Sequence, residues 1–304
     1  MAQLESLKDA PLIRDRIYDM LRSEILSGGF APGDDLNILS ISKQLGVSCA
    51  PVREALNMLN KDGLVDLTPY KTASVAVGTE EDYKNIWADY LDAQRDYAAV
   101  KTLLSAHDDV MKRAVEYGSG IRLLHQDPWE TLISFIVSQN SNIPRIKKCV
   151  ESLCSNFGES LGEYRGQERF AFPTAERLAG LTQEDLSVCR LGYRDKYILE
   201  TAAAVAADGG RTLAGSRELS FADAEKYIRS LKGVGPKVAN CILLFGLLKY
   251  ESFPLDVWMK RIMHELYGFE EGDMKGMAAY ARENFGEYSG FAQQYLFYYA
   301  RENL

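Results

Sequence analysis

Near the C-terminal end of the chain, a helical pattern is interrupted by glycines and restarts at once. The interruption reads Gly233-Val-Gly235-Pro-Lys237, and the apolar residues Val238, Cys241 and Ile242 then resume a helical face. Glycine permits a tight turn and a close approach of the backbone to a ligand, and proline suits the first turn of a helix. We therefore expect two helices joined by a tight turn, with the amides that begin the second helix exposed to an anion. A DNA phosphate can bind such amides without any basic side chain.

Two ionisable residues lie at the predicted helix starts of this region. Lys237 follows the glycine turn, and Asp256 lies in Phe253-Pro-Leu-Asp256-Val-Trp258, a second proline-led helix start. The positive end of a helix dipole disfavours an ammonium group and favours a carboxylate. A neutral Lys237 would be a nucleophile toward a sugar carbon, and an ionised Asp256 would stabilise a developing oxocarbenium ion. Alone, each could be a solvated residue or an N-cap, but their occurrence together after Gly-Val-Gly-Pro favours a catalytic pair.

The first 78 residues follow a different pattern. Apolar spacing predicts a helix from Ile13 to Ile25, a second helix ending at Gly46 and a third with Ser48 as its N-cap. The period then changes to that of strands at residues 64–67 and 74–77. Helix, helix, helix and hairpin together predict a winged helix for this part of the chain.

From residue 79 to 304, helical patterns are separated by glycines and no strand pattern is evident. This part is expected to be an all-α domain. The predicted fold class is therefore mainly α, with a winged helix over residues 1–78 and a helix-hairpin-helix domain over residues 79–304.

Composition limits the classes of partner and location. The chain has 304 residues and a formal net charge of -8, which weighs against general affinity for polyanions. Five cysteines without a CxxC pair predict a reduced, cytoplasmic protein, and three scattered histidines suggest no metal or other cofactor. No segment has the pattern of a leader or the length of a membrane span, so no membrane partner is expected.

The stretch Gly46-Val-Ser-Cys-Ala-Pro-Val-Arg-Glu-Ala-Leu56 resembles the recognition-helix region of GntR-family regulators, and the resemblance covers about residues 11–77. It implies that Arg53 contacts DNA in helix-turn-helix geometry. Cys49 stands where the family usually has arginine, and Thr72 where it has a glycine in the wing tip. Both departures count against operator-specific binding, and Arg53 could also belong to a solvated helix face.

Residues from about 79 to 304 resemble the helix-hairpin-helix 8-oxoguanine DNA glycosylase/AP lyase family. The resemblance implies base-excision repair of double-stranded DNA that contains an oxidised purine opposite cytosine. Lys237 would displace the flipped base as a Schiff base, β-elimination would nick the strand, and Asp256 would assist electrostatically. No C-terminal cysteine quartet is present, so an iron–sulfur cluster is not expected.

Further residues carry the same resemblance. Three correspond to the pocket for the flipped base: Cys241, Gln293 and Phe297. Six belong to predicted contacts with DNA: Asn140, Arg145 and Arg194 at the opposite cytosine, Tyr193 as the aromatic wedge, and Gly233 and Gly235 in the glycine turn. Core packing or helix capping could explain several of these residues singly, but their joint match favours the site.

Two departures from the family affect the prediction. The family's N-terminal antiparallel-sheet domain is expected to be missing, with residues 80–91 as its final piece, and Trp258 stands where many relatives have histidine. Loss of that domain would impair recognition of the lesion. Two alternatives stay open: a DNA-binding regulator that carries an inactive glycosylase module, and an accidental fusion. The oligomeric state is left open.

Overall fold

The structure is a computed structural model that describes residues 13–26, 29–30, 33–67, 73–76 and 80–303. Contacts divide the chain into two compact units, one formed by Met1–Tyr83 with Glu159–Ala171 and the other by Lys84–Gly158 with Phe172–Leu304. The division after Tyr83 lies near the predicted boundary at residue 78. No helix in the described ranges is long and apolar enough to cross a membrane.

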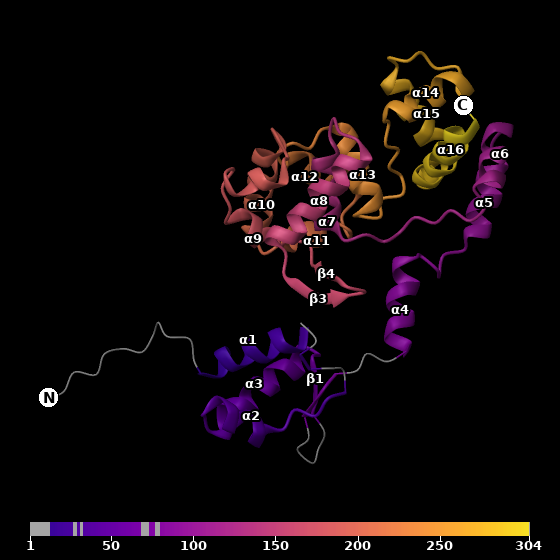
Figure 1. Ribbon diagram of the computed structural model, residues 1–304. Coiled ribbons are helices and arrows are strands. Elements are labelled where there is room, and N and C mark those ends of the chain that lie inside the picture. Colours follow the sequence, from indigo (N-terminus) through magenta and orange to yellow (C-terminus); the bar gives the residue numbers. More distant parts are fainter. Residues whose placement is uncertain (1–12, 27–28, 31–32, 68–72, 77–79, 304) are drawn as a thin grey trace. The chain divides into compact units, whose positions relative to one another are not determined.

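The first unit contains three helices followed by a two-stranded antiparallel sheet (Figure 1). Its elements are α1 (Ile13–Leu26), α2 (Ile38–Leu45), α3 (Cys49–Lys61), β1 (Val65–Leu67) and β2 (Ala73–Val75). In the sheet, Val65 pairs with Val75 and Leu67 with Ala73. This is the predicted order of elements. The expected turn over residues 68–72, which includes Thr72, lies outside the described residues.

Helix ends in this unit follow from the local sequence. α2 starts at Asn37, whose side chain accepts a hydrogen bond from the Ser40 N–H, and ends at Gly46 with a φ of 64°. Ser48 has the predicted N-cap position of α3, although its side chain makes no capping hydrogen bond. The buried core is formed by Ile17, Leu21, Leu36, Ile41, Val52, Ala55, Leu56, Leu59, Val65, Ala73 and Val75.

The second unit is built from helices. The α-helices in chain order are α4 (Glu80–Tyr90), which begins in the first unit, α5 (Tyr97–Ser105), α6 (Asp109–Tyr117), α7 (Pro128–Ser138), α8 (Ile143–Phe157), α9 (Ala175–Ala179), α10 (Arg194–Ala206), α11 (Arg211–Gly215), α12 (Phe221–Ser230), α13 (Pro236–Phe245), α14 (Val257–Tyr267), α15 (Met274–Asn284) and α16 (Ser289–Asn303). Two 3-10 helices are η1 (Asp185–Cys189) and η2 (Gly286–Tyr288).

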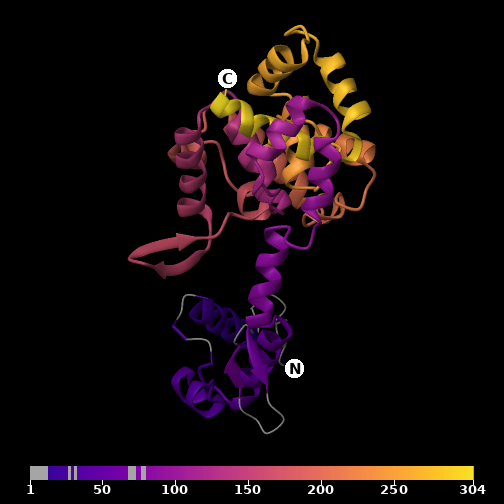
Figure 2. The same ribbon diagram turned by 90° about the vertical axis from the view of Figure 1, so that its right-hand side faces the viewer.

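Two hydrophobic cores organise this unit. One is built mainly from α7 to α13, and the other from α5, α6, α14, α15 and α16. The helix α16 packs against α6 and α14 (Figure 1, Figure 2). The helix α13 contributes to both cores, since Ile242 and Leu243 belong to the first and Leu244 to the second. A residue at the start of α13 is therefore held by a helix that both cores fix.

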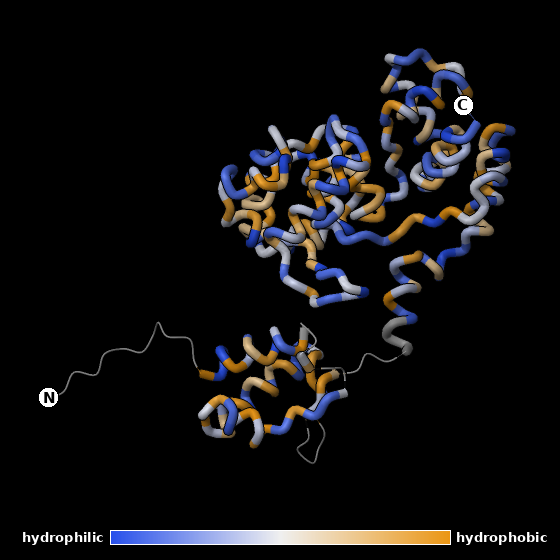
Figure 3. Tube along the Cα trace, in the orientation of Figure 1, coloured by the Kyte–Doolittle hydropathy of each residue, from blue (hydrophilic) through white to orange (hydrophobic). Residues whose placement is uncertain are grey.

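A second hairpin contradicts the expectation that no strands follow residue 79. β3 (Ser160–Tyr164) and β4 (Gln167–Phe170) pair antiparallel. Arg165 and Gly166 at its tip have φ values of 55° and 75°, as two-residue hairpin turns require. Neither strand has a buried residue, and the hairpin is largely hydrophilic (Figure 3). Because no face is buried, the alternation that identifies a strand in a sequence is absent.

Candidate active site

The predicted helical hairpin is present between α12 and α13. Gly235 is the N-cap of α13, Pro236 is its first residue and Lys237 its second. Gly233 has a φ of 78°, and a Cβ there would lie 2.7 Å from ring atoms of Tyr197. Both backbone conformation and space therefore require glycine at position 233.

At Gly235, neither the backbone conformation nor the surrounding space requires glycine. Its φ is -84°, and an added Cβ would meet no protein atom within 4 Å. The first intrahelical bond of α13 runs from the Ala239 N–H to the Gly235 carbonyl at 2.9 Å. The amides of Lys237 and Val238 precede this bond, and such amides have no partner within their helix. The turn therefore directs N–H groups toward an open side of the backbone.

The side chain of Lys237 lies against aromatic residues that sequence reasoning missed. Its Nζ is 5.8 Å from the centre of the Phe135 ring, and Phe135 stacks on Phe245 with ring centres 5.8 Å apart. Phe245 lies two helical turns after Lys237 on α13. The only sequence signal for this wall is the spacing of Lys237, Cys241 and Phe245 on one face of the helix.

Asp256 is the N-cap of α14. Its Oδ1 accepts a hydrogen bond of 2.8 Å from the Met259 N–H, which engages one of the two carboxylate oxygens. The next two side chains are exposed, Val257 by 81% and Trp258 by 40%. The capping role that we considered for Asp256 is thus real, and it fixes the carboxylate at the positive end of the helix dipole.

Cys241 connects the nucleophile candidate with the aspartate. The thiol is buried, and burial raises its pKa to about 11, while Lys237 lowers the pKa and Asp256 raises it. Both Lys237 and Asp256 therefore influence the same thiol electrostatically.

The chain between α13 and Asp256 is fastened at its start. The buried Ser252 hydroxyl donates to the Asn240 carbonyl at 2.8 Å, and the Gly290 N–H donates to the Tyr250 carbonyl at 2.7 Å. A Cβ at Gly290 would lie 2.2 Å from a methyl carbon of Leu244. These contacts tie the segment that leads to Asp256 to both α13 and the first turn of α16.

The predicted base-pocket residues of α16 lie one turn apart on this helix. Gln293 is only 4% exposed, and its Oε1 accepts from the Gln294 amide at 2.6 Å. Phe297 is half-buried and packs against the second core. A separate pocket of about 280 Å³ adjoins Lys237 and is also lined by Asn240, Phe253 and Arg282. Neither Gln293 nor Phe297 lines that pocket, so it is a different space beside the lysine.

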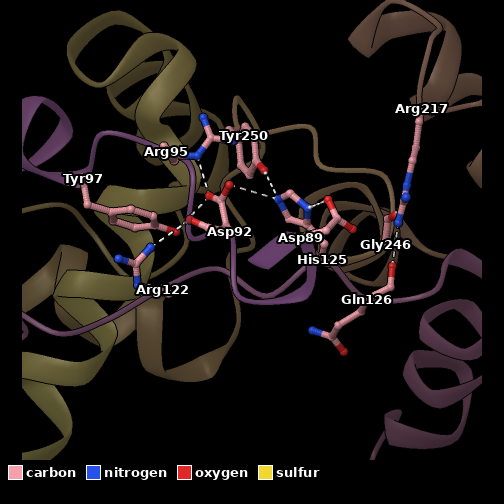
Figure 4. A network of polar contacts seen from close by, with 10 residues as sticks. All are labelled: Asp89, Asp92, Arg95, Tyr97, Arg122, His125, Gln126, Arg217, Gly246 and Tyr250. Carbon is pink, nitrogen blue, oxygen red and sulfur yellow. Dashed lines mark hydrogen bonds and ion pairs between the residues drawn. The ribbon is translucent and has the colours of Figure 1, made fainter. Parts of the chain in front are cut away.

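Tyr250 belongs to a polar network that the sequence did not reveal (Figure 4). The Tyr250 hydroxyl lies 3.2 Å from Nε2 of His125, and the Arg95 guanidinium lies 4.4 Å from the Tyr250 ring centre. Asp92 is buried and accepts from Arg95 and, at 3.0 Å, from the Tyr97 hydroxyl. Burial raises the pKa of Tyr250, which keeps the phenol neutral. The network therefore gives the segment that leads to Asp256 a further anchor at Tyr250.

Residues expected at the opposite cytosine surround the loop between α7 and α8. Asn140 has a φ of 46°, and the exposed Arg145 donates through Nη2 to the Arg190 carbonyl at 3.3 Å. Tyr193 is 52% exposed, and its ring lies 5.8 Å from that of Tyr197 in an edge-to-face arrangement. The role of Tyr193 as a wedge, for which an exposed ring is needed, stays a prediction.

Arg194 differs from the expectation of a DNA contact. It is 4% exposed, and its guanidinium donates to the carbonyls of Gln139 at 2.9 Å, Leu191 at 2.8 Å and Asn140 at 3.0 Å. These bonds hold the loop that carries Asn140. Within the described part of the chain, no group of three His, Cys, Asp or Glu side chains is arranged to hold a metal ion.

Comparison with known families and proteins agrees with this geometry. Residues 133–287 match the HhH-GPD superfamily of base excision DNA repair proteins, and residues 38–132 match the N-terminal domain of 8-oxoguanine DNA glycosylase. The chain therefore belongs to the HhH-GPD superfamily of base-excision DNA repair proteins. Within that class it is a DNA glycosylase with AP lyase activity, of the 8-oxoguanine glycosylase type.

Individual relatives cover different shares of the two chains. A probable N-glycosylase/DNA lyase of Methanothermobacter thermautotrophicus is 32% identical over 217 residues, which are 64% of this chain and 68% of the relative. The N-glycosylase/DNA lyase of Saccharomyces cerevisiae is 41% identical over 158 residues, 49% of this chain and 42% of the relative. The Clostridium acetobutylicum 8-oxoguanine glycosylase/lyase superposes with a TM-score of 0.69 at 41% identity, covering 79% of this chain and 81% of that one.

The match over residues 38–132 contradicts the expectation that only residues 80–91 remain of the family's N-terminal domain. It includes α5 and α6, which pack in the second core beside α16. A second, shorter similarity is to a helix-turn-helix regulator of Bacillus subtilis, YdhC, which is 35% identical over 72 residues, 24% of this chain and 32% of the relative.

Proposed function

We propose that the chain excises 8-oxoguanine from double-stranded DNA where cytosine lies opposite, and that Lys237 is the nucleophile. The observation that carries this proposal is the position of Lys237, which directly follows the glycine turn and lies one helical turn before Cys241, a thiol whose pKa both Lys237 and Asp256 influence. The C. acetobutylicum relative is described in complex with DNA that contains cytosine opposite 8-oxoguanine. That relative supports the same lesion and the same opposite base here.

The reaction begins when the amine of Lys237 attacks C1′ of the flipped nucleotide. The bond between C1′ and the base breaks, and the base leaves with the electron pair and takes up the proton that the attacking nitrogen loses. The C1′–O4′ bond then opens as O4′ gains a proton, which leaves a protonated imine between C1′ and Lys237. Loss of a proton from C2′ then expels the 3′ phosphate and cleaves the strand. The carboxylate of Asp256 stabilises the positive charge that develops at C1′.

The base-pocket roles follow from the chemistry of three side chains. Because its pKa is raised to about 11, the Cys241 thiol is protonated at neutral pH and forms an uncharged wall. Gln293 offers an amide donor and acceptor to the edge of the base, and Phe297 offers an apolar ring. Selection of a purine by such a pocket depends on the base being flipped out of the duplex.

The DNA contacts divide between the two loops. The amides after Gly233 and Gly235 bind a phosphate near the lesion, and the open space beside Gly235 leaves room for it. Tyr193 inserts at the vacated position in the duplex, and Asn140 and Arg145 bind the opposite cytosine. We assign Arg194 a positioning role, because its guanidinium is already bonded to the loop carbonyls.

Borohydride trapping tests the proposal. Incubation of the full chain with an 8-oxoguanine:cytosine duplex and borohydride should give a covalent protein–DNA adduct, because hydride reduces the imine to a stable amine. Lys237→Gln should abolish the adduct, whereas Lys226→Gln, which removes an exposed lysine of α12, should leave it intact. An adduct that persists in Lys237→Gln would contradict the assignment of the nucleophile.

For the first unit, we propose a GntR-type winged helix over residues 1–78 that binds duplex DNA through α3. Arg53 lies on the exposed side of this helix, beside Glu54, which pairs with Arg14 at 3.7 Å. Arg53→Ala in the full chain should lower affinity for undamaged duplex and leave trapping at saturating lesion duplex unchanged. Sequence-selective binding without any trapping by the wild-type chain would instead favour the regulator alternative.

A further inference from the structure

A basic cleft lies between the first turns of α8 and the end of η1. Its volume is about 720 Å³, and its lining residues include Asn142, Arg145, Lys148, Cys149, Cys189 and Arg190. Three of these side chains are cationic and none is acidic. In a chain whose formal net charge is -8, this local excess of positive charge is the reverse of the overall composition. The cleft therefore has the charge expected of a site for an anion.

The backbone at the rim of the cleft is fixed around Arg190. This residue ends η1 with a φ of 53°, a left-handed conformation that glycine adopts without steric cost and arginine does not. Its carbonyl accepts from Arg145 Nη2 at 3.3 Å and from the Cys149 thiol at 4.0 Å. The exposed guanidinium is thus carried by a strained and well-anchored backbone. Strain of this kind is typical of positions where a side chain serves a function.

The floor of the cleft carries no opposing charge. Cys149 and Cys189 are buried beneath it, 5% and 2% exposed. Burial raises the pKa of the Cys189 thiol, so this thiol is protonated at neutral pH. The Asn142 side chain accepts from the Arg145 N–H at 3.0 Å and so begins α8 at the same edge. An anion in the cleft would face cations and neutral groups only.

We propose that this cleft binds the phosphodiester backbone of the undamaged strand, with Lys148 and Arg190 each paired with a phosphate. The proposal rests on the proposed function, because Arg145 lines the cleft and is also expected at the cytosine opposite the lesion. The strand that carries this cytosine continues from it through its own phosphates. Arginine and lysine at such positions set the register of a protein on a duplex without reading its sequence.

The salt dependence of binding tests the proposal. Each lost phosphate contact should reduce the slope of log affinity against log salt by about 0.9, so the affinity lost between roughly 50 and 200 mM salt should shrink about 3.5-fold per contact. We expect this change for Lys148→Gln and for Arg190→Gly, which keeps the left-handed backbone without strain. The matched control is Lys112→Gln on α6, an exposed lysine of a helix that lies apart from α8 (Figure 1).

A neutral methylphosphonate in the DNA identifies the strand. Placed in the undamaged strand near the opposite cytosine, it should weaken binding of the wild-type chain and have little further effect on Lys148→Gln. Placed in the lesion strand, it should affect both proteins equally. Unchanged salt slopes in both variants, or additive losses in the undamaged strand, would overturn the proposal.

Two readouts separate this inference from neighbouring explanations. Inorganic phosphate, compared with chloride at equal ionic strength, should not abolish the difference between wild type and Lys148→Gln; if it does, the cleft takes free phosphate and the proposal fails. Borohydride trapping at saturating duplex should be unaffected in the Lys112→Gln control. Absence of trapping in the wild-type chain would overturn the proposed function while leaving the salt slopes interpretable.

Discussion

The turn between α12 and α13 and the loop between α7 and α8 both carry residues expected at DNA, but they are held in different ways. The turn is determined by its own backbone, since Gly233 needs a positive φ and α13 starts directly after Gly235. The loop is held from outside, because the buried Arg194 bonds the carbonyls of Gln139 and Asn140. A turn that its own backbone determines can be recognised in a short stretch of sequence. A loop that a distant side chain holds depends on residues far along the chain.

The largest expected effect is a loss of stability on substitution of Gly233, which distinguishes this residue from Gly235 in the same turn. Gly233→Ala should lower the free energy of unfolding by about 3 kcal/mol, because alanine is strained at this φ and its Cβ would overlap the Tyr197 ring. Urea unfolding followed by circular dichroism measures the change. A stability equal to wild type would contradict the claim that the backbone determines this turn.

Gly235→Ala is the matched control in the same turn. Its Cβ would enter open space at an ordinary φ, so stability should change by less than about 0.5 kcal/mol. Affinity for lesion duplex should nevertheless fall, because the added methyl group occupies the side from which a phosphate approaches.

For the externally held loop, Arg194→Met should cost about 2.5 kcal/mol of stability. Methionine retains the buried chain but leaves the loop carbonyls without their donor. If Arg194 were only a DNA contact, this variant would bind less tightly yet unfold at the wild-type urea concentration. Unfolding measurements in the absence of DNA therefore distinguish the positioning role from direct contact.

The pH dependence of the free energy of unfolding tests how deeply the Cys241 thiol of α13 is buried. The usual pKa of a cysteine is 9.0, and burial raises that of Cys241 to about 11. Between these pH values the unfolded chain has lost a proton that the folded chain still binds, so the free energy of unfolding falls as pH rises. The loss should reach about 2 kcal/mol by the end of this window.

Cys241→Ala isolates that contribution, since other groups titrate in both proteins. The stability difference between wild type and Cys241→Ala, measured by urea unfolding, should be constant below pH 8 and should shrink as pH rises above about 9. A difference independent of pH would mean that the thiol is open to solvent.

The smallest expected effect concerns the wedge. Tyr193→Ala should leave stability within about 0.5 kcal/mol of wild type, because the ring is 52% exposed. Excision from the duplex should slow roughly tenfold, which corresponds to about 1.4 kcal/mol, because unstacking is no longer offset by an inserted ring. Excision from an already unpaired lesion should change less. Equal slowing on both substrates would argue against a wedge.

These contrasts also explain what the sequence could predict. The glycine turn, the helix starts at Lys237 and Asp256 and the elements from α1 to β2 depend on local spacing, and the structure has them where they were expected. The burial of Arg194 could not be predicted, because two of its three carbonyl partners, Gln139 and Asn140, lie more than fifty positions earlier. The Asp92 and His125 network is equally non-local, and the β3–β4 hairpin buries no face that would impose a pattern.

The contacts of Gly290 restrict which substitutions the chain can accept at this position. At this one crossing, backbone and side-chain atoms of three segments meet, and even a methyl group would overlap Leu244. A saturation library at position 290, selected for lesion excision, should return glycine alone. The helix of the proposed nucleophile, the segment that leads to Asp256 and the helix of the proposed base pocket must therefore change together.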